Sequence, residues 1–235
     1  MLLKGKVVEA SSLKEHEKIV LFDLMNQFYD HVALTDFLKD FGEKDYCILL
    51  WDETDTIKGF STQKIISVDV EDKKVFGVFS GDTIIHRDHW GSLELYRVFA
   101  RYFTQLARQY DVFYWFLISK GYKTYKILPL FFKAFYPRNR VTTPELEKKI
   151  MDNFGNERYP GEYDQQTGVI DYRGIKDKLK EGVADLTEKH LKDQHIAFFS
   201  QVNPGYVKGD DLVCIARLEK DNLNKTAIRL LLGDG

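Results

Sequence analysis

The segment SGDTIIHRDHWGS, residues 80–92, contains several side chains that can take up or release protons near neutral pH. Asp82 stands near the end of a strand-like run, where its carboxylate can line a cleft between splayed strands. The imidazoles of His86 and His89 titrate closest to pH 7, and Glu94 lies just beyond the segment. These are residue types that enzymes use as general acids and bases.

The same residues also have readings that need no catalysis. Asp82 can cap a local turn or pair with Arg87, and the imidazoles can cap the helix that follows them. A metal site is a further alternative, with five candidate ligands: His31, His86, Asp88, His89 and His195. A structural zinc site needs four closed ligands, and no spacing in the sequence supplies them, so we expect no metal.

Several well-known catalytic fingerprints are missing from the sequence. It contains no GxxxxGK[ST] phosphate loop, no GxGxxG turn, no CxxC pair and no HExxH motif. The tripeptide at residues 86–88, HRD, matches the start of a kinase catalytic loop, but the required asparagine and a preceding glycine-rich loop are missing. The match with kinases is therefore attributed to chance.

The composition is that of a folded domain with an uneven charge distribution. Of the 235 residues, 44% are hydrophobic and 30% charged, which excludes disorder of the whole chain. Lys and Arg number 34 and Asp and Glu 36, so the formal net charge is −2. Residues 112–144 contain six basic side chains and no acidic one, so this segment carries +6 and the remainder −8.

The basic segment 112–144 is also rich in aromatic residues: Phe113, Tyr114, Trp115, Phe116, Tyr122, Tyr125, Phe131, Phe132, Phe135 and Tyr136. The plain interpretation is an aromatic core whose lysines extend to solvent. Alternatively, the segment is a nucleic-acid surface, with Lys and Arg on phosphates and aromatic rings stacked on bases. The chain would then be a non-catalytic binding module.

The cysteines and the hydrophobic runs indicate a cytoplasmic protein. Cys47 and Cys214 each stand in an apolar run, where a small buried thiol is the ordinary interpretation. The start of the chain lacks the pattern of a signal peptide. The longest apolar run, residues 112–118, is far shorter than the roughly 20 residues that a membrane helix needs.

The hydrophobic periodicity predicts helices and a strand meander in the first half of the chain. A first helix is expected over about 12–32 and a second over 35–41, ending at Gly42 in a left-handed cap. Three antiparallel strands follow at 46–51, 57–70 and 74–85, with acidic turns between them. A strongly amphipathic helix at 93–110 and a buried strand at 113–119 come next.

The second half is predicted to be more irregular. A helix over 122–135 contains Pro129, so it is expected to begin late or to be kinked there. A further helix starts at residues 143–145 and ends before Gly155, and a charged helical region covers about 174–193. Residues 195–202 and 211–218 read as the strands of a C-terminal hairpin.

The element order and the HRDHWGS loop together resemble the Gcn5-related N-acetyltransferase (GNAT) superfamily. The resemblance covers roughly residues 12–136. It implies an α+β fold of three layers, with a mixed, mostly antiparallel central sheet flanked by helices. The domain plan is then a core at 1–140, a helical insertion or lid at 141–195, and a hairpin at 196–235 that completes the same sheet.

The resemblance also implies a site for an acyl-thioester donor. In the family, a strand delivers a glycine-rich loop to a helix N-terminus, whose N–H groups hold the pyrophosphate of acyl-CoA. The matching positions here are Thr83, Ile84, Ile85, His89, Gly91 and Ser92. The loop departs from the family pattern, because His89 takes the place of an arginine and Trp90 and Ser92 take the places of glycines.

The activity implied is N-acyl transfer from acyl-CoA or an acyl carrier protein to a small amine. Asp82 or His86 would deprotonate the amine, and Tyr125, with Tyr122 as second choice, would protonate the departing thiolate. The aromatic, basic segment 112–144 would then form an apolar tunnel for an acyl chain, with a rim that attracts phosphates or an acidic carrier protein.

Overall fold

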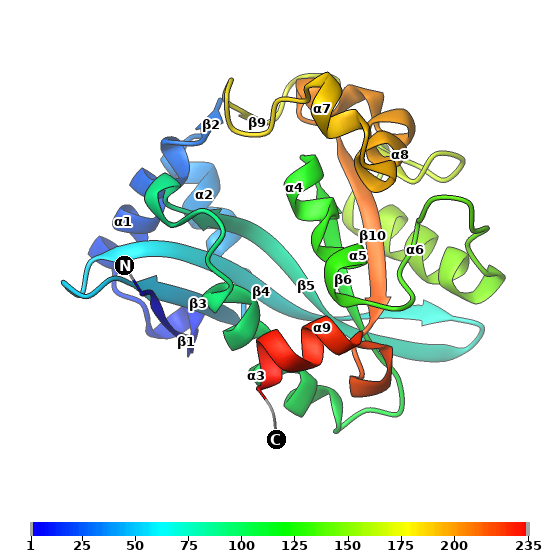
Figure 1. Cartoon of the computed structure of the whole chain (residues 1–235), viewed down its shortest axis with the longest axis horizontal. Coiled ribbons are helices and arrows are strands. Elements are labelled where there is room, and N and C mark those ends of the chain that lie inside the picture. Colours follow the sequence, from blue (N-terminus) through cyan, green and yellow to red (C-terminus); the bar gives the residue numbers. More distant parts are fainter. Residues whose placement is uncertain (1, 234–235) are drawn as a thin grey trace.

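One sheet of eight strands dominates the structure (Figure 1). The computed structural model describes residues 2–233. In sheet order the strands are β1 (Lys4–Glu9), β3 (Tyr46–Trp51), β4 (Ile57–Val70), β5 (Lys73–Ile85), β6 (Phe113–Ser119), β10 (Asp211–Arg217), β8 (Val169–Ile170) and β7 (Tyr163–Asp164). A separate two-stranded sheet joins β2 (Tyr29–Asp30) to β9 (Lys178–Leu179).

Only one neighbouring pair of strands in the large sheet of residues 2–233 is parallel. β5 and β6 run in the same direction, with α3 between them in the chain, and every other neighbour is antiparallel. The expected fold class, a mixed and mostly antiparallel sheet flanked by helices, is therefore confirmed.

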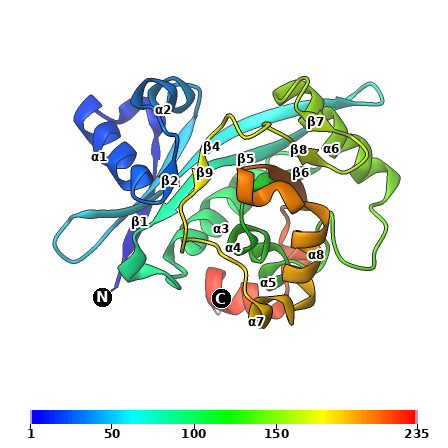
Figure 2. The same ribbon diagram turned by 90° about the horizontal axis from the view of Figure 1, so that it is seen from above.

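Helices cover both faces of this sheet (Figure 2). Their bounds are α1 (Glu15–Asn26), α2 (Leu34–Phe41), α3 (Glu94–Ala107), α4 (Tyr122–Tyr125), α5 (Ile127–Phe131), α6 (Glu145–Arg158), α7 (Glu188–Leu191), α8 (Gln194–Val202) and α9 (Lys225–Ala227), which a π-helical turn at Ile228–Leu232 continues. In Figure 2, α1, α2 and α6 lie on one side of the sheet, and α3, α5 and α8 lie on the other.

The hydrophobic core is divided in the same way. Leu21 of α1 and Phe41 of α2 pack with Phe60, whereas Phe103 of α3 belongs to a second cluster with Trp115. Phe154 of α6 packs on the sheet, with its ring centre 5.4 Å from that of Phe79 and 4.9 Å from that of Phe116. Burial of these large side chains on both faces is what holds the sheet between two helical layers.

The predicted strands at 46–51, 57–70, 74–85 and 113–119 agree with β3, β4, β5 and β6 to within one residue. Pro129 lies inside α5, and the predicted helix 122–135 is split into α4 and α5. Gly42 does end α2, but with φ −62° it is right-handed, so the expected left-handed cap is wrong.

The predicted C-terminal hairpin is also wrong, because residues 194–202 form helix α8. The Asp193 carboxylate accepts hydrogen bonds from the N–H groups of His195 and Ile196 and so caps the helix. Of the two predicted strands only β10 joins the sheet, where it pairs with β6 and β8.

The aromatic residues of segment 112–144 are mostly core. Nine of the ten are buried, and Tyr136 is partly buried. The basic side chains of the segment are largely engaged with the protein itself, as in the ion pairs of Lys120 with Asp211 and of Lys126 with Asp193. The core interpretation is confirmed, and the aromatic rings offer no stacking platform for nucleic-acid bases.

Two further sequence expectations concern thiols and membranes. Cys47 and Cys214 are free thiols with no exposed surface, and burial raises the pKa of both. A search of the described residues finds no helix of sufficient length and apolar character to cross a membrane.

Candidate functional site

The parallel strands β5 and β6 are paired only along part of their length. The pairing runs from Phe76 opposite Phe113 to Ser80 opposite Leu117 and then stops. Beyond this point β5 continues through residues 81–85, paired with β4 alone. The two strands therefore separate in the middle of the sheet and leave a gap between them.

A β-bulge lies where the strands separate. Ser80 is opposite Gln63 and Thr83 is opposite Ser61, so two residues of β5, Gly81 and Asp82, face one residue of β4. A Cβ atom at Gly81 would lie 2.7 Å from Thr62 Oγ1, which is too close, so this position requires glycine. The bulge re-aims the strand and directs Asp82 toward the gap.

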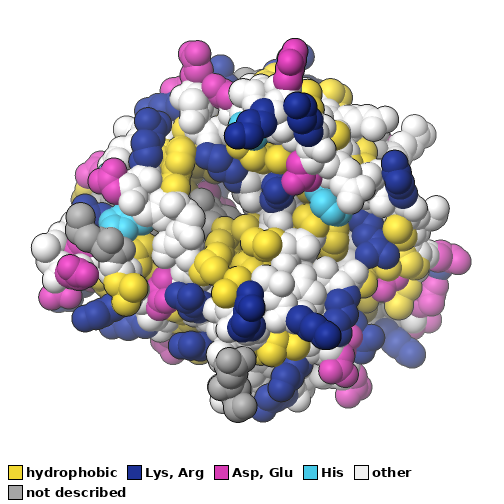
Figure 3. All heavy atoms as spheres, viewed as in Figure 1, with side chains coloured by type: hydrophobic (Ala, Val, Ile, Leu, Met, Phe, Trp, Pro, Cys, Tyr) yellow, Lys and Arg dark blue, Asp and Glu magenta, His cyan; other side chains and the backbone are white. Residues whose placement is uncertain are grey.

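The gap opens into a cavity of about 760 Å³ that reaches both helical layers. The apolar side of its lining comes from α3, β6 and α5: Leu95, Tyr96, Phe99, Trp115, Leu117 and Ile127. The other side is rich in charged residues: Asp40, Lys44, Asp82, Lys120, Arg158, Asp177 and Asp211. Figure 3 shows hydrophobic side chains gathered beside a hollow near the middle of one face, with Lys and Arg side chains around them.

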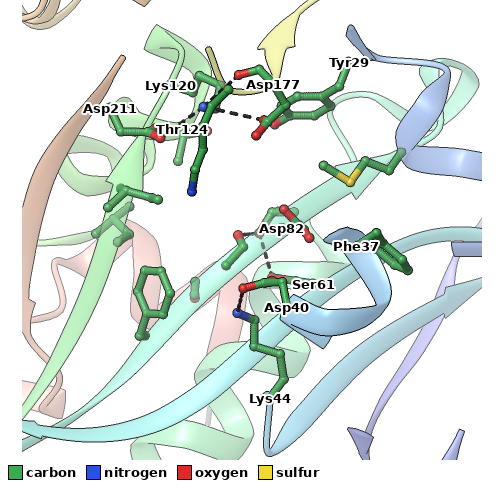
Figure 4. Close-up of a pocket in the computed structure, with 18 of the residues that line it drawn as sticks. Tyr29, Phe37, Asp40, Lys44, Ser61, Asp82, Lys120, Thr124, Asp177 and Asp211 are labelled. Atoms are coloured by element: carbon green, nitrogen blue, oxygen red, sulfur yellow. Dashed lines mark hydrogen bonds and ion pairs between the residues drawn. The ribbon is translucent and has the colours of Figure 1, made fainter. Parts of the chain in front are cut away.

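Asp82 lies at the centre of the charged side (Figure 4). Burial, with the nearby carboxylates of Asp40 and Asp177, raises the pKa of its carboxyl to about 7, against the opposing effect of Lys44 and Lys120. A carboxylate with such a pKa is half ionised near neutral pH, which is the property required of a general base.

An ion pair between a buried lysine and a half-exposed aspartate lies below Asp82 (Figure 4). Lys44 has a side chain only 1% exposed, and its Nζ donates to Asp40 Oδ1 over 2.7 Å. The same Nζ lies 5.7 Å from the centre of the Phe79 ring. The positive charge of Lys44 at this side of the cavity is therefore balanced by the carboxylate of Asp40.

A second charged cluster, formed by Lys120, Asp177 and Asp211, lies at the other end of the cavity from Lys44 (Figure 4). Lys120 Nζ donates to the backbone carbonyls of Gly209 at 2.7 Å and Asp177 at 3.1 Å. It also lies 3.2 Å from Asp211 Oδ2 and 3.5 Å from Asp177 Oδ2. Burial lowers the pKa of Lys120, but the carboxylates of Asp211 and Asp177 outweigh it and raise the pKa overall.

The segment that carries β9 forms one wall of the cavity. Asp177 immediately precedes β9, which pairs with β2 through Tyr29 opposite Leu179. Figure 2 shows this segment passing from β2 toward α7. The pairing and the Lys120 contacts together fix the wall against the body of the protein.

The free edge of β5 supplies backbone donors to the gap. His86 N–H donates to the Lys58 carbonyl on β4 over 2.7 Å. Because N–H groups alternate in direction along a strand, those of Thr83 and Ile85 point to the opposite edge, where β6 has moved away. Of these two donors, the N–H of Thr83 lies at the gap next to Asp82, because Thr83 lines the cavity and Ile85 does not.

The HRDHWGS loop follows β5 and leads to α3, as the sequence predicts. Gly91 has φ +93° with open space around it, and Ser92 Oγ accepts a hydrogen bond from the N–H of Glu94. Trp90 does not fill the helix N-terminus but folds back, so that its indole N–H donates to the Ile85 carbonyl over 2.9 Å. Lys123 Nζ lies 3.6 Å from the centre of the same indole.

The structure brings only some of the predicted site residues to the cavity. Asp82 and Thr83 line it. The remaining ones, Ile84, Ile85, His86, His89, Gly91, Ser92, Tyr122 and Tyr125, are not among its lining residues. His86 instead sits at the start of the loop, where its Nδ1 accepts from the N–H of Asp88, and His89 is buried. His86 is therefore not retained as the base.

Tyr125 is a core residue and not a residue of the cavity. Its side chain has no exposed surface, and its hydroxyl donates to the Pro137 carbonyl over 2.9 Å. The short α4 turns the ring toward Phe199, at 5.7 Å between ring centres, instead of toward the gap. The structure thus gives Tyr125 a packing role, and we do not retain it as the acid for a leaving thiolate.

Replacing Tyr125 tests this assignment. Tyr125→Phe is expected to lower the free energy of unfolding by about 1–3 kcal/mol, because the buried Pro137 carbonyl loses its donor. Turnover should stay within about twofold of wild type once the assay is run well below the melting temperature. A tenfold or larger fall in kcat with unchanged stability would instead return Tyr125 to the catalytic site.

Sequence reasoning missed the residues contributed by segments far apart in the chain. These are Lys44, Ser61, Gln63, Lys120, Asp177 and Asp211. The available signal was the alternation of polar residues in otherwise apolar strands, since Ser61 and Gln63 are fully buried and share one face of β4.

No group of three or more His, Cys, Asp or Glu side chains within residues 2–233 is arranged to hold a metal ion. The candidate ligands His31 and His195 lie on separate elements, the first after β2 and the second in α8.

No family profile and no curated protein matches the sequence. Solved structures do show similarity to about half of the chain. A probable N-acyltransferase from Enterococcus faecalis has 14% identity and a TM-score of 0.42, over 57% of this chain and 33% of that one. This chain therefore corresponds to about a third of that protein.

Two further solved structures have comparable similarity. A GNAT family N-acetyltransferase from Escherichia coli, in complex with CoA, has 10% identity and a TM-score of 0.39, over 56% of this chain and 70% of that one. An aminoglycoside acetyltransferase from an uncultured soil sample, in complex with sisomicin, has 12% identity and a TM-score of 0.39, over 53% of this chain and 82% of that one. At such low identities the activity of the present chain has to be argued from its own residues.

Proposed function

We propose that this protein is an N-acyltransferase that moves an acyl group from an acyl thioester to an amine. The observation that carries the proposal is the position of Asp82, on a bulge at the point where two parallel strands separate. Its pKa of about 7 suits a base, and a cavity of about 760 Å³ is of the size that binds small molecules.

The reaction needs a nucleophilic amine, a polarised carbonyl and a place for the proton. Asp82 takes a proton from the attacking amine, the C–N bond forms, and the C–S bond breaks to release a thiolate that solvent protonates. The free N–H group of Thr83 at the edge of β5 donates a hydrogen bond to the carbonyl oxygen as it gains negative charge.

The two sides of the cavity support different substrates. The apolar side, with Tyr96, Phe99 and Ile127, suits an acyl group larger than acetyl. The charged side, with Asp82 and Asp40, suits the amine. The donor is acyl-CoA in this proposal, because Arg87 and Lys123 flank Trp90 at the loop before α3, where phosphates would lie. An acyl carrier protein is the alternative donor.

The alternative function, a non-catalytic module that binds nucleic acid through residues 112–144, is not favoured. The aromatic side chains that would stack on bases are buried, and Lys120 and Lys126 are engaged in ion pairs. A binding surface of that kind needs exposed rings and free cations.

The proposal is tested by the release of free thiol from a panel of acyl-CoA donors of increasing chain length, each incubated with a panel of small amines. Turnover that depends on both substrates, with the longer acyl groups preferred, is expected. If no donor is consumed and none shifts the melting temperature, the proposed function is contradicted.

A further inference from the structure

The cavity contains a chain of buried hydrogen bonds that the proposed mechanism does not yet use. Its five members, Trp115, Ser80, Gln63, Ser61 and Thr83, all line the cavity. The chain runs from Trp115 Nε1 to Ser80 Oγ at 2.8 Å, and from Ser80 Oγ to Gln63 Oε1 at 2.6 Å. It continues from Gln63 Nε2 to Ser61 Oγ at 2.7 Å and reaches Thr83 Oγ1 after a further 2.7 Å.

Trp115, the first member, determines which group donates and which accepts at the first links of this chain. An indole N–H can only donate, so Ser80 Oγ accepts from it and in turn donates a hydrogen bond to Gln63 Oε1. This orients the Gln63 amide, whose oxygen faces Ser80 and whose NH₂ donates to Ser61. Either hydroxyl of the Ser61–Thr83 pair can donate by geometry, but the proton of the buried Ser61 has no other hydrogen-bond acceptor within residues 2–233, which favours Ser61 as donor and Thr83 Oγ1 as acceptor.

Thr83 is therefore left with a hydroxyl proton at the cavity end of the chain. Apart from Ser61, the acceptor within reach of this proton among the described residues is the Gly81 carbonyl. Its oxygen lies 3.4 Å from Thr83 Oγ1, which is at the limit of a hydrogen bond. Ser61 and Gln63 have almost no exposed surface, so the upstream members cannot turn to solvent. Thr83 is partly buried and lines the cavity.

We infer that the Thr83 hydroxyl is a preorganised hydrogen-bond donor to the carbonyl oxygen of the acyl thioester. A thioester carbonyl oxygen is a good acceptor, whereas the thioester sulfur is a weak one. Asp82, the proposed base, is the preceding residue of β5, and both residues line the same cavity. The inference rests on the proposed function and adds to it a side-chain donor that a chain of four buried residues orients.

The test compares two ligands that differ only in the carbonyl: octanoyl-CoA, and S-octyl-CoA, in which a methylene replaces it. Their dissociation constants are measured by calorimetry without an amine. Wild type is expected to bind octanoyl-CoA more tightly, and the Thr83 hydroxyl is expected to contribute about fivefold to this preference, the size of one ordinary hydrogen bond. In Thr83→Val, which keeps the backbone N–H, the preference should fall by about fivefold, and in Thr83→Ser, which keeps the hydroxyl, it should persist.

Thr62→Val is the matched control. Thr62 is the neighbouring threonine on β4, it is fully buried, and its Oγ1 has no hydrogen-bond partner within residues 2–233. The same chemical change there should leave the preference for the carbonyl intact. Melting temperatures of all variants establish that each is folded.

The outcomes separate this inference from the proposed function. If wild type binds neither ligand, the proposed acyl-CoA chemistry fails, and the inference fails with it. If wild type binds both with equal affinity, or if its preference for octanoyl-CoA survives undiminished in Thr83→Val, only the role of Thr83 is overturned.

Discussion

Asp82→Asn is expected to lower kcat/KM for acyl transfer by at least about 100-fold, since a positioned general base contributes 10²–10⁴-fold. The amide keeps the size and shape of the side chain but cannot take a proton from the amine. Initial rates of thiol release at subsaturating donor measure the effect. Asp69→Asn serves as a control, because Asp69 is exposed on β4 and is not among the cavity residues.

The pH profile provides a second test of the same residue. The ionised form of Asp82 is the active one, and burial raises its pKa to about 7, so kcat/KM of wild type should rise with pH up to about 7. Asp82→Asn should lack this rise and retain only the pH dependence of the amine itself. Activity of the variant within threefold of wild type, with an unchanged profile, would remove Asp82 from the mechanism.

Lys120→Met is expected to cost about 3–5 kcal/mol in the free energy of unfolding. The substitution leaves Asp211, 1% exposed, without the positive charge that lies 3.2 Å from its carboxylate, and an unpaired buried charge is costly. Two backbone carbonyls also lose their donor. Urea unfolding measures the change, and Lys189→Met, at an exposed lysine, should stay within about 0.5 kcal/mol of wild type.

The stability loss in Lys120→Met should depend on pH in a defined direction. Burial raises the pKa of Asp211, and removing Lys120 removes the charge that opposes this rise. The folded variant then binds a proton that the unfolded chain releases, so its stability falls as pH increases. The deficit should therefore be larger at pH 8 than at pH 5. Lys120→Met combined with Asp211→Asn should recover part of the loss, and a deficit below 1 kcal/mol at pH 8 would contradict the role given to this pair.

The strands around the site could be predicted from the sequence because their local features agree with the fold. β3, β4, β5 and β6 are rich in β-branched and aromatic residues and are bounded by polar turns, so periodicity alone defines them. α8 was misread because its central residues, Ile196 to Phe199, also favour strands. Its helical start depends on the Asp193 side chain, a capping signal that the sequence contains.

The site was predictable only where one segment supplies it. Asp82 and Thr83 belong to the segment that was singled out, and both line the cavity. The bulge that aims Asp82 depends on the register between β5 and β4, which no local pattern determines. The contact of Lys120 with Asp211 arises from the pairing of β6 with β10, whose residues are far apart in the chain.

Tyr125 shows the limit of arguing from position in the chain. It follows β6 at the spacing expected for an acid at the thioester, yet α4 is a single turn that directs its hydroxyl to Pro137. Spacing places this side chain just after β6, but the direction of its hydroxyl depends on tertiary packing.

The most direct measurement of the central claim is hydrogen exchange of the β5 amides in the presence of octanoyl-CoA. If the thioester enters the gap between β5 and β6, exchange at Thr83 should slow markedly at saturating ligand, while β1 and β3 remain unchanged. Bound ligand that leaves residues 81–85 exchanging as before, with protection elsewhere, would contradict the placement of the reaction at this gap.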